Sequence, residues 1–177
     1  MQEIKIYGRG GQGVVTAAEV LAVAAFKDGK FSQAFPSFGP ERRGAMVTSF
    51  ARIGNKPIRV RTQVYEPDYV IVQDSTLLSE EGIAKGVKKA MVVNVPNPPT
   101  FKVPVEIWIV DATRIALEVF DRPLFNMPML GAFAAATKEL VSLKSIIEAL
   151  RERFSGKIAE KNVEAIKLSF EGVRQVK

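Results

Sequence analysis

The residues best suited to bind a ligand form a glycine-rich loop near the N-terminus, Gly8-Arg9-Gly10-Gly11-Gln12-Gly13. The loop fits the pattern G-x-G-x-x-G and lies between an alternating polar and apolar run at 3–7 and an apolar run at 14–26. The first run predicts a strand and the second a buried helix. A strand, a glycine loop and a helix together direct backbone N–H groups and a helix N-terminus at an anion, usually a phosphate. We therefore predict that this loop binds an anionic group, with the Arg9 guanidinium as a charge-assisted donor.

The same loop lacks the carboxylate that a NAD site requires. In such sites an acidic residue about 20 positions further along binds the ribose 2′-hydroxyl, but the sequence has no acid between Asp28 and Glu41. Two interpretations of the glycines stay open: they bind an anion, or they only permit positive φ and close packing in a tight turn. A dinucleotide-binding reductase would need Arg42 and Arg43 to accept the 2′-phosphate of NADP.

A second candidate loop, residues 36–44, is rich in proline, glycine and arginine. Its prolines restrict the backbone, and the paired Arg42 and Arg43 can clamp a phosphate through their guanidinium groups. The alternative is a rigid interface element in which Phe38 enters a partner's pocket. Asn126 precedes an apolar helical run, so it is expected first of all to cap that helix. The residues assigned to an interface or a ligand loop are Ser37, Phe38, Gly39, Pro40, Glu41, Gly44 and Asn126.

The composition excludes several kinds of active site. The 177 residues include no cysteine and no histidine. Their absence removes thiolate nucleophiles, cysteine-ligated iron–sulfur clusters and the commonest general base and metal ligand. We therefore predict no catalytic residue and no metal site in this chain.

The charge and hydropathy patterns bear on partners and location. The net charge of +6 suits a solvated lysine-rich surface, or else an anionic ligand or an acidic partner subunit. The basic residues are spread along the chain without interleaved aromatics, so no nucleic-acid partner is expected. No charge-free apolar run of about 18 residues is present, and the N-terminus lacks the pattern of a signal peptide. We expect a cytoplasmic protein without a membrane partner.

Strand-like and helix-like stretches alternate along the chain. Strands are expected at 3–7, 31–35, 45–53, 58–61, 69–74, 90–95 and 106–111, and helices at 14–26, from 76, at 112–120, 127–140, from a Ser142 cap to about 154, and at 157–173. The turn at 54–57 should join its two strands as an antiparallel hairpin. The pattern predicts one α/β domain over 1–177: three layers, with a mostly parallel sheet, helices on both faces and a short antiparallel insertion.

With both loops in view, the chain resembles the gamma subunit of the 2-oxoacid:ferredoxin oxidoreductases, the pyruvate or ketoisovalerate synthase family. Three segments carry the resemblance: YGRGGQGV at 7–14, SFGPERRG at 37–44 and NMPMLGA at 126–132, with a weaker match in EKNVEA at 160–165. The similarity runs in order through nearly the whole chain. Met46 departs from the pattern, since a small residue or a proline is expected there.

The resemblance implies an activity, cofactors and partners. The activity is oxidative decarboxylation of a 2-oxoacid, most simply pyruvate, with coenzyme A, giving acyl-CoA and electrons for ferredoxin. Thiamine diphosphate, Mg and the iron–sulfur clusters are expected on partner alpha, beta and delta subunits, and none on this chain alone. The chain is then expected to help enclose the thiamine site, to contact coenzyme A and to be inactive by itself. The alternatives are a free-standing NADP-type reductase and a purely structural assembly subunit.

Overall fold

The first strand and helix form where the sequence predicts them. The computed structural model describes residues 1–37, 44–80, 82–100, 103–138 and 140–177. β1 (Gln2–Arg9) passes through the glycine loop into α1 (Val14–Lys27). The buried residues of α1 recur at helical spacing and form its core-facing side: Val14, Ala17, Ala18, Val20, Leu21, Ala24 and Ala25. Gly29, at φ +75°, reverses the chain just after the helix.

The remaining elements follow in nearly the expected order, with one further short strand near the C-terminus. They are β2 (Phe31–Pro36), β3 (Met46–Gly54), β4 (Tyr69–Val72), the 3-10 helix η1 (Ser75–Ser79), β5 (Ala90–Asn94), β6 (Glu106–Val110), α2 (Ala112–Phe120), α3 (Asn126–Thr137), α4 (Leu143–Arg153), α5 (Gly156–Gly172) and β7 (Arg174–Gln175).

The strands form one seven-stranded sheet in the order β2-β3-β1-β4-β5-β6-β7. β1, β4, β5 and β6 are parallel neighbours, whereas β3 runs antiparallel to both β1 and β2, and β7 antiparallel to β6. Five of the seven strands therefore point the same way. The mostly parallel α/β sheet with an antiparallel insertion is confirmed.

The antiparallel insertion differs in detail from the prediction. The hairpin partner of β3 is β2, and residues 58–61 form no strand. The reason is geometric, because β1 and β2 already occupy both edges of β3. The segment 58–62 has no regular secondary structure instead. The Arg52 guanidinium donates to its Val60 and Thr62 carbonyls at 3.2 and 2.5 Å.

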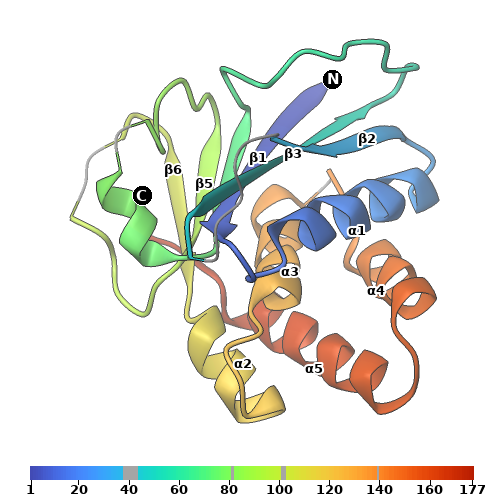
Figure 1. Ribbon diagram of the computed structural model, residues 1–177, viewed down its shortest axis with the longest axis vertical. Coiled ribbons are helices and arrows are strands. Elements are labelled where there is room, and N and C mark those ends of the chain that lie inside the picture. The colour runs from blue at the N-terminus through green and yellow to red at the C-terminus, as the bar shows by residue number, and fades with distance from the viewer. Residues whose placement is uncertain (38–43, 81, 101–102, 139) are drawn as a thin grey trace.

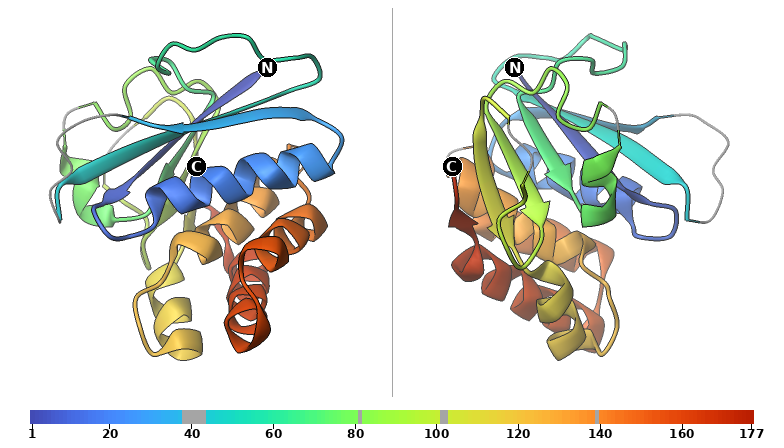
Figure 2. Two further views of the ribbon diagram at one scale, coloured as in Figure 1. Left: turned by 45° about the vertical axis from the view of Figure 1, so that its right-hand side comes forward. Right: turned by 90° about the vertical axis from the view of Figure 1, so that its left-hand side faces the viewer.

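Both faces of the sheet are covered, but not alike (Figures 1 and 2). All five α-helices contribute to one hydrophobic core with the face that carries Ile4 and Ile6. Over the described residues, the other face, which carries Tyr7, Val70 and Val72, is covered by η1 and by residues around 83–87, at 95 and at 103–105, not by an α-helix. The expectation of helices on both faces is corrected to this extent.

The composition of the segments on the second face explains why their described residues form no long helix. The helix expected from residue 76 stops after one 3-10 turn, and Gly82 and Gly86 follow at φ +94° and +73°. The β5–β6 connection contains Pro96, Pro98 and Pro99, which disfavour a helix.

Within the described residues, no helix is long and apolar enough to cross a membrane.

Candidate functional site

A cleft opens at the carboxyl ends of β1, β4 and β5. β1 is where the strand order divides, with β3 and β2 on one side and β4, β5 and β6 on the other. Ligands of α/β sheets usually bind at such a division, because the connections leave the strands in opposite directions. The cleft has a volume of about 570 Å³. Its walls come from the glycine loop, from the strand ends and from the first turns of two helices: Gly10, Gly11, Gln12, Gly13, Gln73, Asp74, Ser75, Asn94, Thr113, Pro123, Leu124, Phe125 and Asn126.

The glycine loop needs glycine for two separate reasons. At Gly8 a Cβ would lie 2.6 Å from the Val14 side chain, so that position is fixed by packing. Gly11 and Gly13 adopt φ +94° and +69°, a left-handed conformation that other residues adopt at a cost. Gly13 is also the residue before α1, and no side chain caps this helix. The glycines therefore permit positive φ and close packing, and the loop also leaves the positive end of α1 open toward the cleft, so an additional role in binding an anion stays a prediction.

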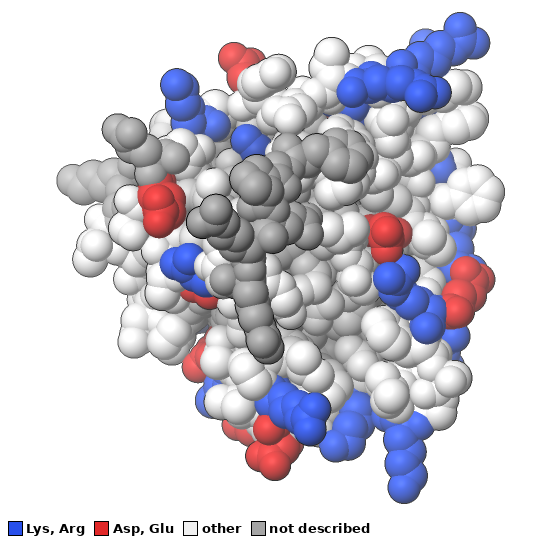
Figure 3. Space-filling view, in the orientation of Figure 1, with Lys and Arg blue, Asp and Glu red and all other residues white. Residues whose placement is uncertain are grey.

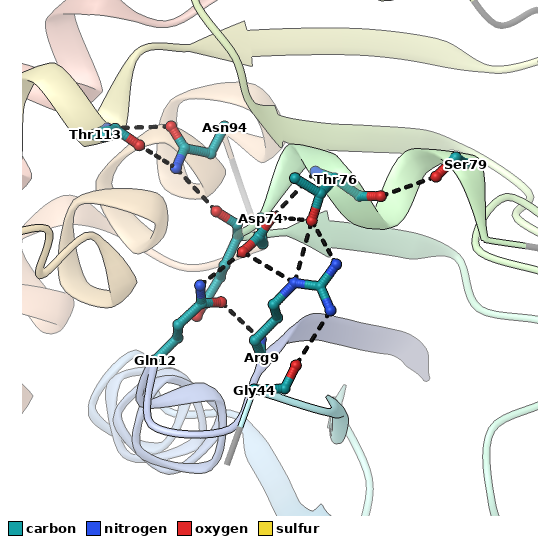
Figure 4. Close-up of polar contacts among 9 residues, drawn as sticks. Arg9, Gln12, Gly44, Asp74, Thr76, Ser79, Asn94 and Thr113 are labelled. Atoms are coloured by element: carbon teal, nitrogen blue, oxygen red, sulfur yellow. Dashed lines mark hydrogen bonds and ion pairs between the residues drawn. The ribbon is translucent and has the colours of Figure 1, made fainter. Parts of the chain in front are cut away.

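Arg9 forms internal contacts that hold the loop (Figure 4). Its Nε and Nη2 donate to the Thr76 hydroxyl at 3.1 and 2.6 Å, and its Nη1 donates to the Gly44 carbonyl at 3.2 Å. The same guanidinium lies 3.5 Å from the Asp74 carboxylate. Arg9 thus joins the glycine loop, the start of η1 and the end of the second candidate loop.

Asp74 and Gln12 complete this network. The Gln12 amide donates to Asp74 at 2.7 Å, while its oxygen accepts from the Arg9 backbone N–H at 2.6 Å. Thr76 donates to Asp74 through its hydroxyl at 2.6 Å and through its backbone N–H at 3.0 Å. Burial acts to raise the pKa of Asp74, but the hydrogen bonds from Thr76 and Gln12 and the Arg9 charge outweigh it and lower the pKa below 3.8. Asp74 is therefore ionised at neutral pH, and both of its carboxylate oxygens accept hydrogen bonds.

A second polar network fixes the end of β5. The Asn94 amide donates to the Gln73 carbonyl and to the Thr113 hydroxyl, both at 2.9 Å, and its oxygen accepts from the Thr113 backbone N–H at 3.1 Å. These bonds tie β4, β5 and the first turn of α2 together (Figure 4).

Gln73 is the one side chain of the cleft lining whose buried amide has no partner among the described residues. It is 0% exposed, and neither its Oε1 nor its Nε2 makes a hydrogen bond within the described chain. Buried polar groups in proteins are nearly always bonded, so this amide is suited to a polar group that enters the cleft. Gln73 was not among the residues predicted from the sequence, although a polar residue directly after a buried strand at the carboxyl edge is a signal for such a site.

Asn126 has a different role from the one expected. The residue before α3 is Phe125, no side chain caps this helix, and Asn126 is its first residue. The prediction of an Asn126 cap is wrong, because its amide faces the glycine loop, where it donates to the Gly13 carbonyl at 3.4 Å. The uncapped N-termini of α1 and α3 thus converge on one cleft. Its described lining contains no lysine or arginine, so helix dipoles, amides and hydroxyls supply the donors.

The two candidate loops meet at their described ends. The Gly10 N–H donates to the Ala45 carbonyl at 2.8 Å, and Gly44, at φ +82°, accepts from Arg9. At the other end of the second loop, the Ser37 N–H donates to Thr48 at 2.9 Å, continuing the β2–β3 pairing. Phe38, Gly39, Pro40, Glu41, Arg42 and Arg43 lie outside the described residues, so their predicted roles stay predictions.

The strand arrangement disfavours a dinucleotide site of the NAD(P) type. In that fold a second parallel strand lies beside the first and carries the group that binds the ribose. Here the neighbours of β1 are the antiparallel β3 and the parallel β4, while β2 lies beyond β3. Over the described residues, no group of three or more His, Cys, Asp or Glu side chains could hold a metal ion.

Comparison with known proteins gives concordant matches along the whole chain. Residues 3–172 match the family model described as pyruvate ferredoxin/flavodoxin oxidoreductase. The chain is 51% identical over 178 aligned positions to pyruvate synthase subunit PorC of Methanothermobacter thermautotrophicus, covering 100% of this chain and 98% of that protein. It is 50% identical to the pyruvate/ketoisovalerate oxidoreductases common subunit gamma of Thermococcus kodakarensis, with 96% of each chain covered. The crystal structure of pyruvate oxidoreductase subunit PORC from Thermotoga maritima superimposes with a TM-score of 0.88 at 35% identity, covering 99% and 98% of the two chains.

Proposed function

This chain belongs to the pyruvate ferredoxin/flavodoxin oxidoreductase family, and on that premise we propose that it completes the active site of its complex and contacts coenzyme A. The chain is a gamma-type subunit of a 2-oxoacid:ferredoxin oxidoreductase. In the proposed reaction a 2-oxoacid, most simply pyruvate, and coenzyme A give acyl-CoA and carbon dioxide, and two electrons pass to ferredoxin. Alpha, beta and delta partner subunits carry thiamine diphosphate with its Mg and the iron–sulfur clusters, and the reaction takes place in the cytoplasm.

The cleft at the end of β1 is the observation that supports a coenzyme A contact. Two uncapped helix N-termini, those of α1 and α3, open into it. Such N–H groups suit a phosphate, and coenzyme A carries several. The neutral amides and hydroxyls of the lining fit the polar groups of a nucleotide or of a pantetheine arm, whereas they form no metal site. If Arg42 and Arg43 act as the sequence predicts, they add a cationic clamp beside these neutral donors.

The proposed contribution to catalysis is enclosure. Thiamine, when bound on the partners, supplies the carbanion chemistry. The role of this chain is to cover that site, orient coenzyme A and exclude water, for which no nucleophile of its own is needed. The isolated chain is therefore expected to be inactive.

The test introduces a carboxylate where the anion is proposed to bind. Asn126→Asp places a negative group at the start of α3, where the helix dipole favours it, but this group repels an anionic ligand. Like charges about 4 Å apart repel by roughly 1–4 kcal/mol, so we expect the KM for coenzyme A of the assembled enzyme to rise about tenfold or more. The KM for the oxoacid should stay the same.

The matched control is Ser155→Asp, which places a carboxylate before α5, another helix without a side-chain cap and away from the cleft. It should leave both KM values unchanged. If Asn126→Asp also leaves the KM for coenzyme A unchanged in an intact complex, the chain is a structural assembly subunit and the ligand role is rejected.

A further inference from the structure

A second surface, remote from the cleft lining, carries a concentration of positive charge. The basic loop, residues 55–65, contains Lys56, Arg59 and Arg61 and no acidic residue. It follows β3 and runs across the top of the view in Figure 1, where Figure 3 shows Lys and Arg side chains gathered at the upper right. All three cations are exposed.

The basic loop is held in shape by a buried arginine. Arg52 is 0% exposed, donates to Glu3 at 2.8 Å and lies over the Phe35 ring at 4.9 Å. Its remaining N–H groups donate to Gln33 and to the Val60 and Thr62 carbonyls of the loop. A fully buried guanidinium is therefore committed to fixing a segment without regular secondary structure. This preorganises the side chains that the segment exposes.

Several other surface cations are neutralised within the chain, whereas those of the basic loop are not. Lys27, Lys88, Arg114, Arg151 and Arg153 each pair with a carboxylate of this chain. Lys56, Arg59 and Arg61 form no ion pair with any described residue. Their charge is thus available to groups outside the chain.

Exposed apolar side chains accompany these cations. Val60 is 42% exposed and Tyr65 is 74% exposed, while Val64 between them is buried and secures the backbone. Tyr and Arg are the residue types most enriched at the centres of protein interfaces. A surface for nucleic acid or free phosphate would have no use for the exposed Val60.

We propose that the basic loop is a docking surface for a carboxylate-bearing face of a partner subunit within the same oxidoreductase. The proposal rests on the family membership, which requires partner chains, and is independent of the coenzyme A cleft. A permanent subunit is favoured over ferredoxin, because a preformed loop with exposed apolar side chains suits a lasting interface rather than a transient encounter. The arginines would then pair with carboxylates across the interface while Val60 and Tyr65 become buried.

The test compares two charge reversals that change the net charge equally. Arg59→Glu with Arg61→Glu alters the basic loop, and Lys157→Glu with Lys161→Glu alters exposed cations on α5 that also form no ion pair with a described residue. Each tagged variant is expressed with its partner subunits and purified at about 0.15 M salt, and the partners retained are quantified. We expect the loop variant to retain about tenfold less of one partner and the α5 variant to retain the normal amount.

Two further arms keep the result interpretable. The Arg59→Lys, Arg61→Lys variant preserves the charge and should assemble normally. A folding defect caused by any substitution at these exposed positions would not spare this variant. If the loop and α5 variants retain their partners equally, or lose them equally, the docking surface is wrong. An intact complex with a raised KM for ferredoxin alone would assign the loop to ferredoxin and overturn the proposal.

Discussion

At the scale of single residues, Gln73 has an arrangement that the fold alone does not explain. Its amide is buried at the floor of the cleft, yet its two polar atoms are unpaired among the described residues. Leaving a buried polar group unsatisfied costs about 1–3 kcal/mol. The unpaired Gln73 amide therefore lowers the stability of the free chain, and a ligand group that bonds to this amide restores the lost free energy.

This trade-off predicts opposite effects of one substitution. Gln73→Met removes the unsatisfied amide at similar volume, so the free energy of unfolding of the purified chain should rise by about 1 kcal/mol. In the assembled enzyme the same change should raise the KM for coenzyme A severalfold. Chemical denaturation and steady-state kinetics measure the two effects.

Ser49→Ala is the matched control for this prediction. The Ser49 hydroxyl is also buried without a partner among the described residues, but it lies on β3 and not in the cleft lining. Its removal should stabilise the chain without changing the KM. A Gln73→Met enzyme with unchanged kinetics would mean that the amide bonds only to water.

At the scale of elements, the position of α3 depends on its close approach to α5. A Cβ on Gly131 would overlap the backbone carbonyl of Ile166, so only glycine lets the two helices lie this close. That contact in turn helps set the N-terminus of α3 against the glycine loop, where Asn126 reaches Gly13.

We therefore expect Gly131→Ala to be strongly destabilising, although alanine normally favours a helix. Overpacking of a tight contact costs about 1–3 kcal/mol, which outweighs the gain of nearly 1 kcal/mol in helix propensity. Thermal unfolding of the purified chain measures the loss. Gly172→Ala, at the end of α5 with nothing near its Cβ position, should be neutral or slightly stabilising. Equal effects of the two changes would contradict the packing argument.

At the scale of the whole molecule, two partly buried carboxylates make stability depend on pH. Asp28 joins the end of α1 to the start of α4, accepting from the Ser142 N–H at 2.6 Å and from the Ser142 and Ser145 hydroxyls at 2.7 and 2.6 Å. Burial acts to raise its pKa, but these bonds and the nearby Lys30 charge lower it below 3.8. The pKa of Asp74 is also lowered.

Because the folded pKa of Asp28 lies below the unfolded one, its contribution to stability is complete above about pH 4–5 and is lost as the pH falls through the lowered value. Asp28→Asn should reduce the free energy of unfolding by about 1–2 kcal/mol at pH 7, and the difference from the native chain should shrink below about pH 4. Urea denaturation at several pH values measures this. The control is Asp121→Asn at the exposed end of α2, where Asn tolerates the φ of +59°. A difference that stays constant with pH would show that the Asp28 charge is not responsible.

The sequence by itself determined the local elements and the family. Periodicity located the helices and most strands, and the Ser142 cap is confirmed. Three short segments, in their order along the chain, identified the oxidoreductase gamma type. These features are local, since spacing, glycine and proline act within a few residues of themselves.

Only the tertiary structure decided which distant groups meet. It gave β3 two neighbours and so left the expected strand at 58–61 unpaired, and it placed all five α-helices on one face of the sheet. It also directed Arg9 into an internal network, turned Asn126 toward Gly13 and buried Gln73 without a partner among the described residues. Such outcomes depend on which strand edges and surfaces are already occupied by segments far away in the chain. This competition between distant segments cannot be inferred from the local pattern of residues.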